Sequence, residues 1–370
     1  METFKSLYTN TVRRRDPILI ASIIILIGLG LVTLCSASFA RFKFQAIVCA
    51  AGIVLFVIAS LVDINIVRKL IIPLGFLALV LCILTFVPGI GMELGGAKRW
   101  IKIGRFTYQP SEMVKLFLPL YLAHIFDKKR DSLDVFSKSV LPPFVVSVGF
   151  ILLIIFQSFS TAIFITLNVL VIFFLAGIRL RYFISAFFIF VPLSVLLLLL
   201  RPHRVDRIQS FLSPGSDPLG IDYQSINSVK AVSSGGFLGK GIGQGTLKIN
   251  GSVPEIHSDF IFSAYCEEGG FLGVTLFLIL LAVFAVLGYK GALGSDTLFK
   301  RLLGVSLVTM IVSQSLMNIS VAAGWLPVTG VPLPFFSHGG SSLITTLVSA
   351  GLIVNISRYK ARRIQDVLYG

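Results

Sequence analysis

Long apolar runs without a single charge are the feature that most restricts how this chain can fold. The first run, from Pro17 to Ser38, has 22 residues and no charged side chain. At about 1.5 Å rise per residue, a helix of that length crosses a hydrocarbon layer of about 30 Å. Mean hydropathy is +0.92, and only 13% of the residues are charged. This composition is typical of an integral membrane protein.

The same length criterion predicts about ten membrane-spanning helices and an all-α, polytopic fold. The spans are expected at residues 17–38, 44–62, 70–87, 110–126, 139–156, 160–177, 182–200, 260–287, 302–323 and 338–357. We interpret residues 1–370 as one transmembrane domain with three longer outer loops. These loops are residues 88–109, 201–259 and 324–340.

The distribution of Lys and Arg predicts that both termini are cytoplasmic, because basic residues favour cytoplasmic loops. In that orientation 19 of the 32 basic residues lie inside, 12 lie outside and Lys115 lies within a span. The outer basic residues are suited to anionic headgroups, a partner protein or an anionic ligand. Nucleic acid is not expected as a partner, because these residues lie between membrane spans and no nucleic-acid motif accompanies them.

Asp259 is the most informative single residue, because it ends the long polar loop and directly precedes the apolar run that begins at Phe260. Placing an ionised Asp in hydrocarbon costs roughly 2.5 to 3.5 kcal/mol on insertion scales, so a carboxylate at the end of a span usually has a function. The position therefore predicts chemistry or transport at the outer membrane surface.

Other charged residues lie inside predicted spans. Glu112 and Lys115 are three residues apart and share one helix face, which predicts either a structural ion pair or a polar cavity. Glu267 and Glu268 are adjacent, so at least one of them is expected to point into the protein. The apolar segment 324–342 contains three prolines and four glycines, which predicts non-helical backbone that folds back into a site.

Several common classes of site find no support. The four cysteines lie in or beside apolar runs and show no metal-ligand spacing, and the four histidines are scattered. There is no Walker-type phosphate loop, and the glycines between Gly235 and Gly245 lack the flanking strand and helix of a dinucleotide site. The sequence thus encodes no recognisable zinc, ATP or dinucleotide site.

Taken in order, four groups of motifs resemble the SEDS family (shape, elongation, division and sporulation), which includes RodA and FtsW of the bacterial cell wall machinery. The resemblance covers nearly the whole chain. The matching residues are Gly96–Trp100 with Gln109–Glu112 and Lys115; Asp217-Pro218 with Gly235-Gly236; Pro254-Glu255 with His257 and Asp259-Phe260; and Leu326–Ser342.

The resemblance implies a peptidoglycan glycosyltransferase that polymerises lipid II, a disaccharide-pentapeptide on undecaprenyl pyrophosphate, at the outer face of the bacterial cytoplasmic membrane. It implies that Asp259 is the catalytic base. Arg99 and Lys115 are implied to hold the pyrophosphate or to shape its cavity, with Glu112 orienting Lys115. Forming the glycosidic bond requires a base for the acceptor hydroxyl and cations for the leaving group.

Two further implied roles concern Glu255 and His257, which position Asp259 or assist a divalent cation. The chain departs from the family pattern at Ser158, where many members carry an acidic residue, so the metal assignment stays open. A class B penicillin-binding transpeptidase and other division or elongation membrane proteins are the implied partners. Gly243–Gly245 with Lys248, and Pro327–Gly330, resemble the FtsW branch somewhat more than the RodA branch.

Two functions of other classes remain open from the residues alone. A flippase or transporter of a lipid-linked sugar also needs intramembrane charges and broken backbone. The polar residues are strongly biased to the outer side, however, whereas alternating access needs a comparable inner pathway. A non-catalytic scaffold for cell wall enzymes is compatible with the remaining features but leaves Asp259 unexplained.

Overall fold

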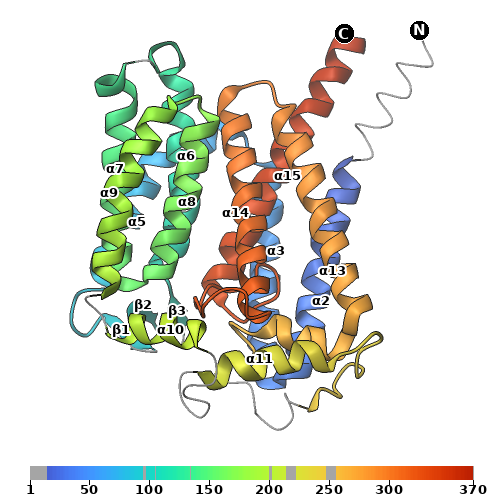
Figure 1. Ribbon diagram of the computed structural model, residues 1–370. Helices are drawn as coiled ribbons and strands as arrows, with labels where there is room; N and C mark the ends of the chain where they lie inside the picture. The colour runs from blue at the N-terminus through green and yellow to red at the C-terminus, as the bar shows by residue number, and fades with distance from the viewer. Residues whose placement is uncertain are drawn as a thin grey trace.

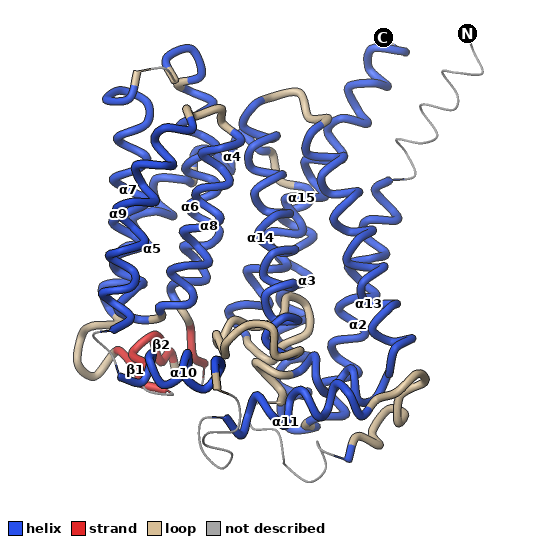
Figure 2. Tube along the Cα trace, viewed as in Figure 1, coloured by secondary structure: helices blue, strands red, loops and turns tan. Residues whose placement is uncertain are grey.

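The computed structural model describes residues 15–94, 97–104, 106–133, 135–199, 202–213, 222–246 and 256–369. Helices account for most of them (Figure 2). The α-helices are α2 (Arg15–Ala37), α3 (Phe39–Leu61), α4 (Ile64–Lys69), α5 (Ile71–Leu84), α6 (Pro110–Lys128), α7 (Leu141–Gln157), α8 (Phe159–Leu175), α9 (Leu180–Leu199), α10 (Pro202–Leu212), α11 (Asp222–Ser234), α13 (Ile261–Leu293), α14 (Leu298–Ala322) and α15 (Gly340–Tyr369). A 3-10 turn (Arg130–Ser132) and a π-helical turn (Phe136–Val140) precede α7.

The multi-pass helical fold predicted from the sequence is confirmed. By length and composition, six helices of the described chain can cross a membrane. They are Pro17–Ala37, Phe39–Leu61, Phe136–Gln157, Ile261–Leu293, Leu298–Ala322 and Gly340–Arg358. Ile71–Leu84 and Phe159–Leu175 are apolar but shorter, and α6 and α9 occupy the two other predicted positions.

The helices form two groups that lie side by side (Figure 1). One group contains α5 to α9, and the other contains α2, α3, α13, α14 and α15; α14 joins the two groups through contacts with α6 and α8. Small residues allow close helix packing, as at Gly351 of α15, where an added Cβ would lie 2.5 Å from the backbone oxygen of Phe56 in α3.

The expectation of an all-α fold is wrong for the loop 88–109. Strands β1 (Gly91–Leu94), β2 (Ala97–Ile103) and β3 (Phe106–Tyr108) form an antiparallel three-stranded sheet in the order β1-β2-β3. Along Ala97–Ile103 the even-numbered Lys98 and Lys102 are exposed and the odd-numbered Ile101 is buried, although Lys98-Arg99 and Trp100-Ile101 interrupt the alternation of polar and apolar residues. This period of two is the pattern of a half-buried strand, which a criterion based on long apolar runs does not detect.

α2 begins and α15 ends at the same end of the bundle, which we call the terminal end (Figure 1). The opposite end, which we call the loop end, bears the sheet, α10, α11 and the non-helical segment 324–339. At the terminal end Arg68 forms an ion pair with Asp127, and its guanidinium lies 4.2 Å from the ring centroid of Phe299. Asp127 also accepts a hydrogen bond from the backbone N–H of Phe299 (3.2 Å), which ties α6 to the start of α14.

Candidate active site

Asp259 lies in a turn at the loop end, one residue before Phe260, the N-cap residue of α13. The turn is fixed from both sides, because Ile256 and Phe260 are buried and pack in one small apolar cluster with Ala264. The side chain of Asn318 in α14 donates a hydrogen bond to the backbone oxygen of Asp259 (2.9 Å). The backbone that carries the Asp259 carboxylate is therefore held by an apolar anchor and a buried amide.

The segment 324–339 packs against this turn and against α14. Asn318 donates a second hydrogen bond to the Val331 oxygen (2.9 Å), and Gln314, one helical turn away, donates to the Pro332 oxygen (2.7 Å). The hydroxyl of Ser337 donates to the Ser258 oxygen (2.6 Å). These side chains replace the hydrogen bonds that a proline-rich, non-helical segment cannot make internally, as burial of such backbone requires.

Arg99 of β2 reaches the same place as Asp259. Gly330 has a positive φ of 67°, and a Cβ added there would lie 3.6 Å from Oδ2 of Asp259 and 3.7 Å from Nη1 of Arg99. The Asp259 carboxylate and the Arg99 guanidinium thus converge on one small volume beside Gly330. Any larger side chain at Gly330 would fill that volume and would also strain the backbone.

The electrostatics of this volume involve a second cation, Arg207 of α10. Burial is the main cause that lowers the pKa of Arg99 from its usual value, and Arg207 lowers it further, whereas Asp259 raises it. Arg207 also donates a long hydrogen bond to the backbone oxygen of Val328 (3.5 Å). The repulsion between the two guanidiniums makes the volume favourable for an anion.

Lys115 and Glu112 form the ion pair that the sequence allowed, with 2.8 Å between Nζ and Oε1 and side-chain exposures of 4% and 2%. Lys115 also donates to the side-chain oxygen of Gln314 (3.0 Å). Because Gln314 and Asn318 are four residues apart on α14, Lys115 lies about 6 Å deeper than Asp259 along that helix. Lys115 therefore belongs to a connected polar network beneath the Asp259 turn.

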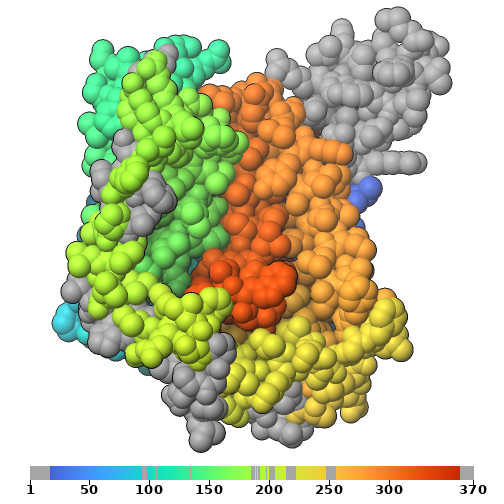
Figure 3. All heavy atoms as spheres, in the orientation of Figure 1, coloured from blue at the N-terminus to red at the C-terminus, as the bar shows by residue number. Residues whose placement is uncertain are grey.

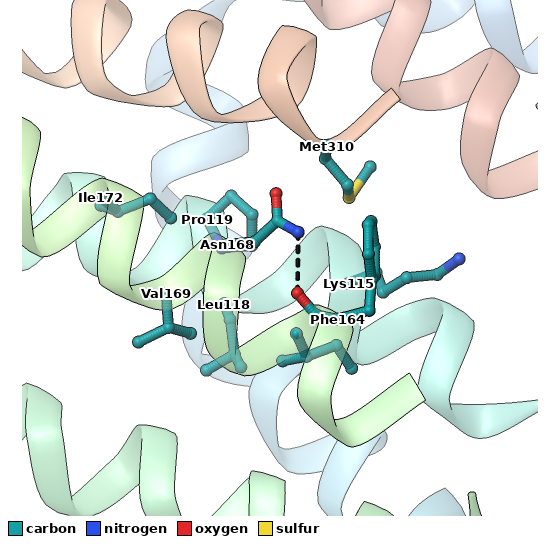
Figure 4. A pocket seen from close by; sticks show the side chains of 9 residues that line it. Lys115, Leu118, Pro119, Phe164, Asn168, Val169, Ile172 and Met310 are labelled. Carbon is teal, nitrogen blue, oxygen red and sulfur yellow. Dashed lines mark hydrogen bonds between the residues drawn. The ribbon is translucent and has the colours of Figure 1, made fainter. Parts of the chain in front are cut away.

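A pocket lies between α6, α8 and α14 at the depth of Lys115 (Figure 4). Its walls are apolar apart from Lys115 and Asn168, and Asn168 donates to the Phe164 oxygen (2.8 Å). The stem of Lys115 lines the pocket while its nitrogen points away from the other labelled side chains (Figure 4). The residues lining the pocket are Lys115, Leu118, Pro119, Phe164, Ile165, Asn168, Val169, Ile172 and Met310.

His257, Glu255 and a possible metal site are the remaining predictions from the sequence. His257 is next to the Asp259 turn, where its backbone oxygen accepts a hydrogen bond from the His338 N–H (2.9 Å) and the two rings are 6.1 Å apart. Glu255 lies outside the described residues. Within the described ranges no three His, Cys, Asp or Glu side chains are grouped as metal ligands. The divalent-cation hypothesis remains a prediction.

Ser158 occupies the N-cap position of α8, yet its side chain caps no backbone N–H. Its hydroxyl hydrogen-bonds the hydroxyl of Thr161 instead (2.8 Å). Where the family pattern has a carboxylate at the start of this helix, the present chain therefore has a neutral pair of hydroxyls.

Sequence reasoning missed three residues of this site: Arg207, Gln314 and Asn318. Arg207 had only been counted among the outer basic residues. Gln314 and Asn318 are polar residues four apart within an apolar span, and this spacing predicts a polar stripe on one face of the helix. That signal was present in the sequence.

Comparison with known proteins places the chain in a family. The model of the FtsW, RodA and SpoVE family, described as "Cell cycle protein", matches residues 17–362. A probable peptidoglycan glycosyltransferase FtsW of Borreliella burgdorferi is 38% identical over 307 residues, which cover 82% of each chain. Stage V sporulation protein E of Bacillus subtilis is 35% identical over 355 residues, covering 92% of this chain and 96% of the relative.

Solved structures agree with this assignment. A chain from a peptidoglycan synthase complex, studied for the structural coordination of polymerization and crosslinking, matches with a TM-score of 0.77 and 29% identity, covering 92% of this chain and 97% of the other. The rod shape determining protein RodA of Thermus thermophilus matches with a TM-score of 0.69 and 27% identity, covering 92% and 96%. The fold and site define a multi-pass helical membrane protein with a charged site at one end. The chain belongs to the FtsW, RodA and SpoVE family.

Proposed function

We propose that the protein is a peptidoglycan glycosyltransferase that polymerises lipid II into glycan strands. The observation that carries this proposal is the convergence of the Asp259 carboxylate and the Arg99 guanidinium beside Gly330. The names of the relatives support the same activity, since several are probable peptidoglycan glycosyltransferases. A base beside fixed positive charge is what transfer of a sugar from a pyrophosphate requires.

In the proposed reaction Asp259 accepts the proton of the acceptor sugar hydroxyl. The hydroxyl oxygen forms a bond to the anomeric carbon of the donor, and the bond from that carbon to the pyrophosphate oxygen breaks. The leaving pyrophosphate takes the bonding electron pair and is stabilised by Arg99 and Arg207. An axial pyrophosphate becomes an equatorial β-1,4 bond, so a single displacement with inversion is sufficient.

Lys115 and Glu112 support this site in the proposal. The 2.8 Å pair holds the ammonium in place, and the bond from Lys115 to Gln314 connects it to the amides that anchor segment 324–339 and Asp259. We propose that Lys115 shapes the lower part of the pyrophosphate cavity. His257 holds the turn through its backbone bond to His338, and a role for Glu255 remains part of the same proposal.

The proposed setting is the bacterial cytoplasmic membrane, crossed by the ten helices α2, α3, α5–α9 and α13–α15. The loop end faces the extracytoplasmic side, where lipid II is polymerised, and both chain termini are cytoplasmic. The excess of Lys and Arg in the segments at the terminal end supports this orientation. The whole of residues 1–370 acts as one transmembrane domain in this proposal.

A crosslinking partner belongs to the proposal as well. The matched synthase complex couples polymerization to crosslinking, and crosslinking is the reaction of a class B penicillin-binding transpeptidase. We propose such a partner here, together with other membrane proteins of division or elongation. A role in division is favoured, because relatives of 33 to 38% identity carry the name FtsW.

Purified full-length protein in liposomes with fluorescent lipid II and a class B transpeptidase tests the activity. We expect glycan polymer on a gel that muramidase digests. Movement of lipid II between leaflets without polymer would instead identify a flippase. If neither polymer nor movement were observed, a non-catalytic scaffold would be the remaining function. Protein with Asp259→Asn, purified and reconstituted at the same density, is the control for polymer made by a contaminant.

A further inference from the structure

The Gly-rich loop, residues 235–246, is fixed to a break in α13. The helix is interrupted at Gly270, whose φ is 58°. The interruption frees backbone groups on both sides, and the loop satisfies them. The N–H groups of Lys240 and Gly241 donate to the oxygens of Glu267 and Glu268 (both 3.0 Å), and the N–H of Phe271 donates to the Gly236 oxygen (2.9 Å).

Contact between the loop and the helix is close enough to require glycine. A Cβ added at Gly270 would lie 2.2 Å from the backbone nitrogen of Gly239, and one at Gly239 would lie 2.1 Å from the Glu268 oxygen. These close approaches show that the stretch is packed against α13 and is not a flexible linker. The glycines permit a tight backbone crossing that fixes the loop in place.

The charged side chains at this crossing turn toward the protein. Lys240 forms an ion pair with the fully buried Glu267, with 2.7 Å between Nζ and Oε1, and Thr246 donates a hydrogen bond to the same carboxylate (3.1 Å). Glu268 accepts a hydrogen bond from Ser36 of α2 (2.5 Å). The polar side chains of Lys240 and Thr246 thus bind a buried carboxylate of α13.

The apolar side chains of the loop turn outward. Phe237, Leu238 and Ile242 are 64%, 73% and 70% exposed. The ring of Phe237 stacks on that of Phe271 at 5.8 Å, and Phe271 is itself 59% exposed. We call these four side chains the apolar tip. In Figure 3 the yellow atoms of this region form a projection on the flank of the molecule, beside α13.

The depth of the apolar tip follows from the length of α13. From Leu272 to Leu293 the helix has about 21 residues, which at ~1.5 Å per residue gives a rise of about 32 Å. The hydrocarbon core of a bilayer is about 30 Å thick. Leu272, whose N–H donates to the Phe237 oxygen (3.2 Å), therefore lies at the edge of the hydrocarbon when Leu293 lies at the opposite edge.

We propose that the apolar tip inserts into the lipid leaflet at the loop end and anchors the Gly-rich loop in the membrane. The tip is continuous with the exposed apolar surface of α13, which includes Leu272, Leu276 and Ile279. Among the described residues of this crossing, Lys240, Glu267 and Glu268 are paired toward the protein, so acyl chains can surround the tip without covering these charges. Aromatic and aliphatic side chains at this depth are characteristic of interfacial anchors.

The anchor is close in sequence to the turn that carries Asp259. About ten residues separate Thr246 from Ile256, where the Asp259 turn begins. Insertion of the apolar tip therefore fixes one end of the connection to that turn at the lipid surface. Contact with lipid at the tip does not depend on glycosyl transfer, so the two proposals can fail separately.

Spin labels on Leu238→Cys and, separately, Ile242→Cys test the anchor in the purified full-length protein in liposomes without any partner. At each site we measure the ratio of collisions with oxygen to collisions with a water-soluble nickel chelate. We expect this ratio to be several-fold higher than at Lys230→Cys, an exposed control on α11. Cys49, Cys82 and Cys266 are buried, and labelled wild-type protein gives the background from them and from Cys35.

Two results would overturn the proposal. Stronger collision with the nickel chelate at both sites would show that the tip lies in water. Low collision with both reagents would show that protein, such as a second copy of this chain, covers it. Because both positions are more than two-thirds exposed, labelling is not expected to disturb folding, and elution as a single species in detergent checks this.

Discussion

Charged side chains are paired differently at the two ends of the helix bundle. At the terminal end, two cations lie in ion pairs with carboxylates, Arg68 with Asp127 and Lys300 with Asp296 (2.9 Å). At the loop end, Arg99 interacts electrostatically with the carboxylate of Asp259 and with the guanidinium of Arg207. Matched pairs stabilise a fold, whereas two neighbouring guanidiniums oppose each other.

This difference indicates which end binds a ligand. Burying Arg99 lowers its pKa, which means that the charged form is disfavoured by its surroundings before any ligand arrives. An anion entering the volume beside Gly330 would relieve that cost, while none of the pairs at the terminal end offers such a gain. Strain of this electrostatic kind is commonly found at functional sites.

The largest expected effect is at the loop end, on Asp259. Replacing it with Asn keeps the shape and the Asn318 hydrogen bond to the backbone but removes the proton acceptor. We expect polymerisation of lipid II to fall by about 10² to 10⁴-fold, the range for loss of a general base. Initial rates from glycan gels give the measurement, with Lys230→Gln as the control, because Lys230 is an exposed residue of α11. Substantial residual polymer would remove Asp259 from the base role.

Arg99→Gln is expected to have the next largest effect, a loss of about 10²-fold in polymerisation, as for removal of one stabilising donor at a leaving group. Thermal stability should not fall, because burial, the largest of the electrostatic effects on Arg99, disfavours its cation, and the substitution removes that cation. Lys98→Gln on the same strand is the matched control, since Lys98 is exposed. A drop in melting temperature with unchanged activity would mean that Arg99 is structural.

Lys115→Met tests whether the deeper pair supports the site through structure. Removal of one partner leaves a buried Glu112 carboxylate and costs about 3 to 5 kcal/mol in soluble proteins. We expect Lys115→Met to lower the melting temperature strongly and the double variant Glu112→Gln/Lys115→Met to recover most of it. Recovery of stability without recovery of polymerisation would show that the Lys115 ammonium contributes directly to the reaction in the pyrophosphate cavity. Recovery of both would limit Lys115 to a positioning role.

The contrast between the ends also separates what the sequence could predict from what it could not. Apolar runs predicted the helices because crossing a membrane imposes a minimum length and composition. Asp259 and the pair Glu112–Lys115 were found because charges are costly beside hydrocarbon. Both signals are local in the sequence, and both arise from the membrane.

Features that depend on contacts between distant segments were not predictable in this way. Arg207 joins the site only because α10 carries it toward Arg99 and Val328. The break at Gly270 is stabilised by a loop about 30 residues earlier, and no local pattern shows that pairing. The sheet in the loop 88–109 was missed because its strands are short and half-polar, unlike the spans around it.

The smallest expected effect is at the terminal end, with Asp127→Asn. The amide keeps an oxygen that can accept from the Phe299 N–H, while the ion pair with Arg68 is lost. Both side chains are partly exposed, at 29% for Arg68 and 19% for Asp127, so we expect a loss of only about 1 kcal/mol. Polymerisation should stay within about twofold of wild type, because the pair stabilises the fold at the end of the bundle opposite the candidate site. A large loss of polymer at unchanged melting temperature would contradict the division of roles between the two ends.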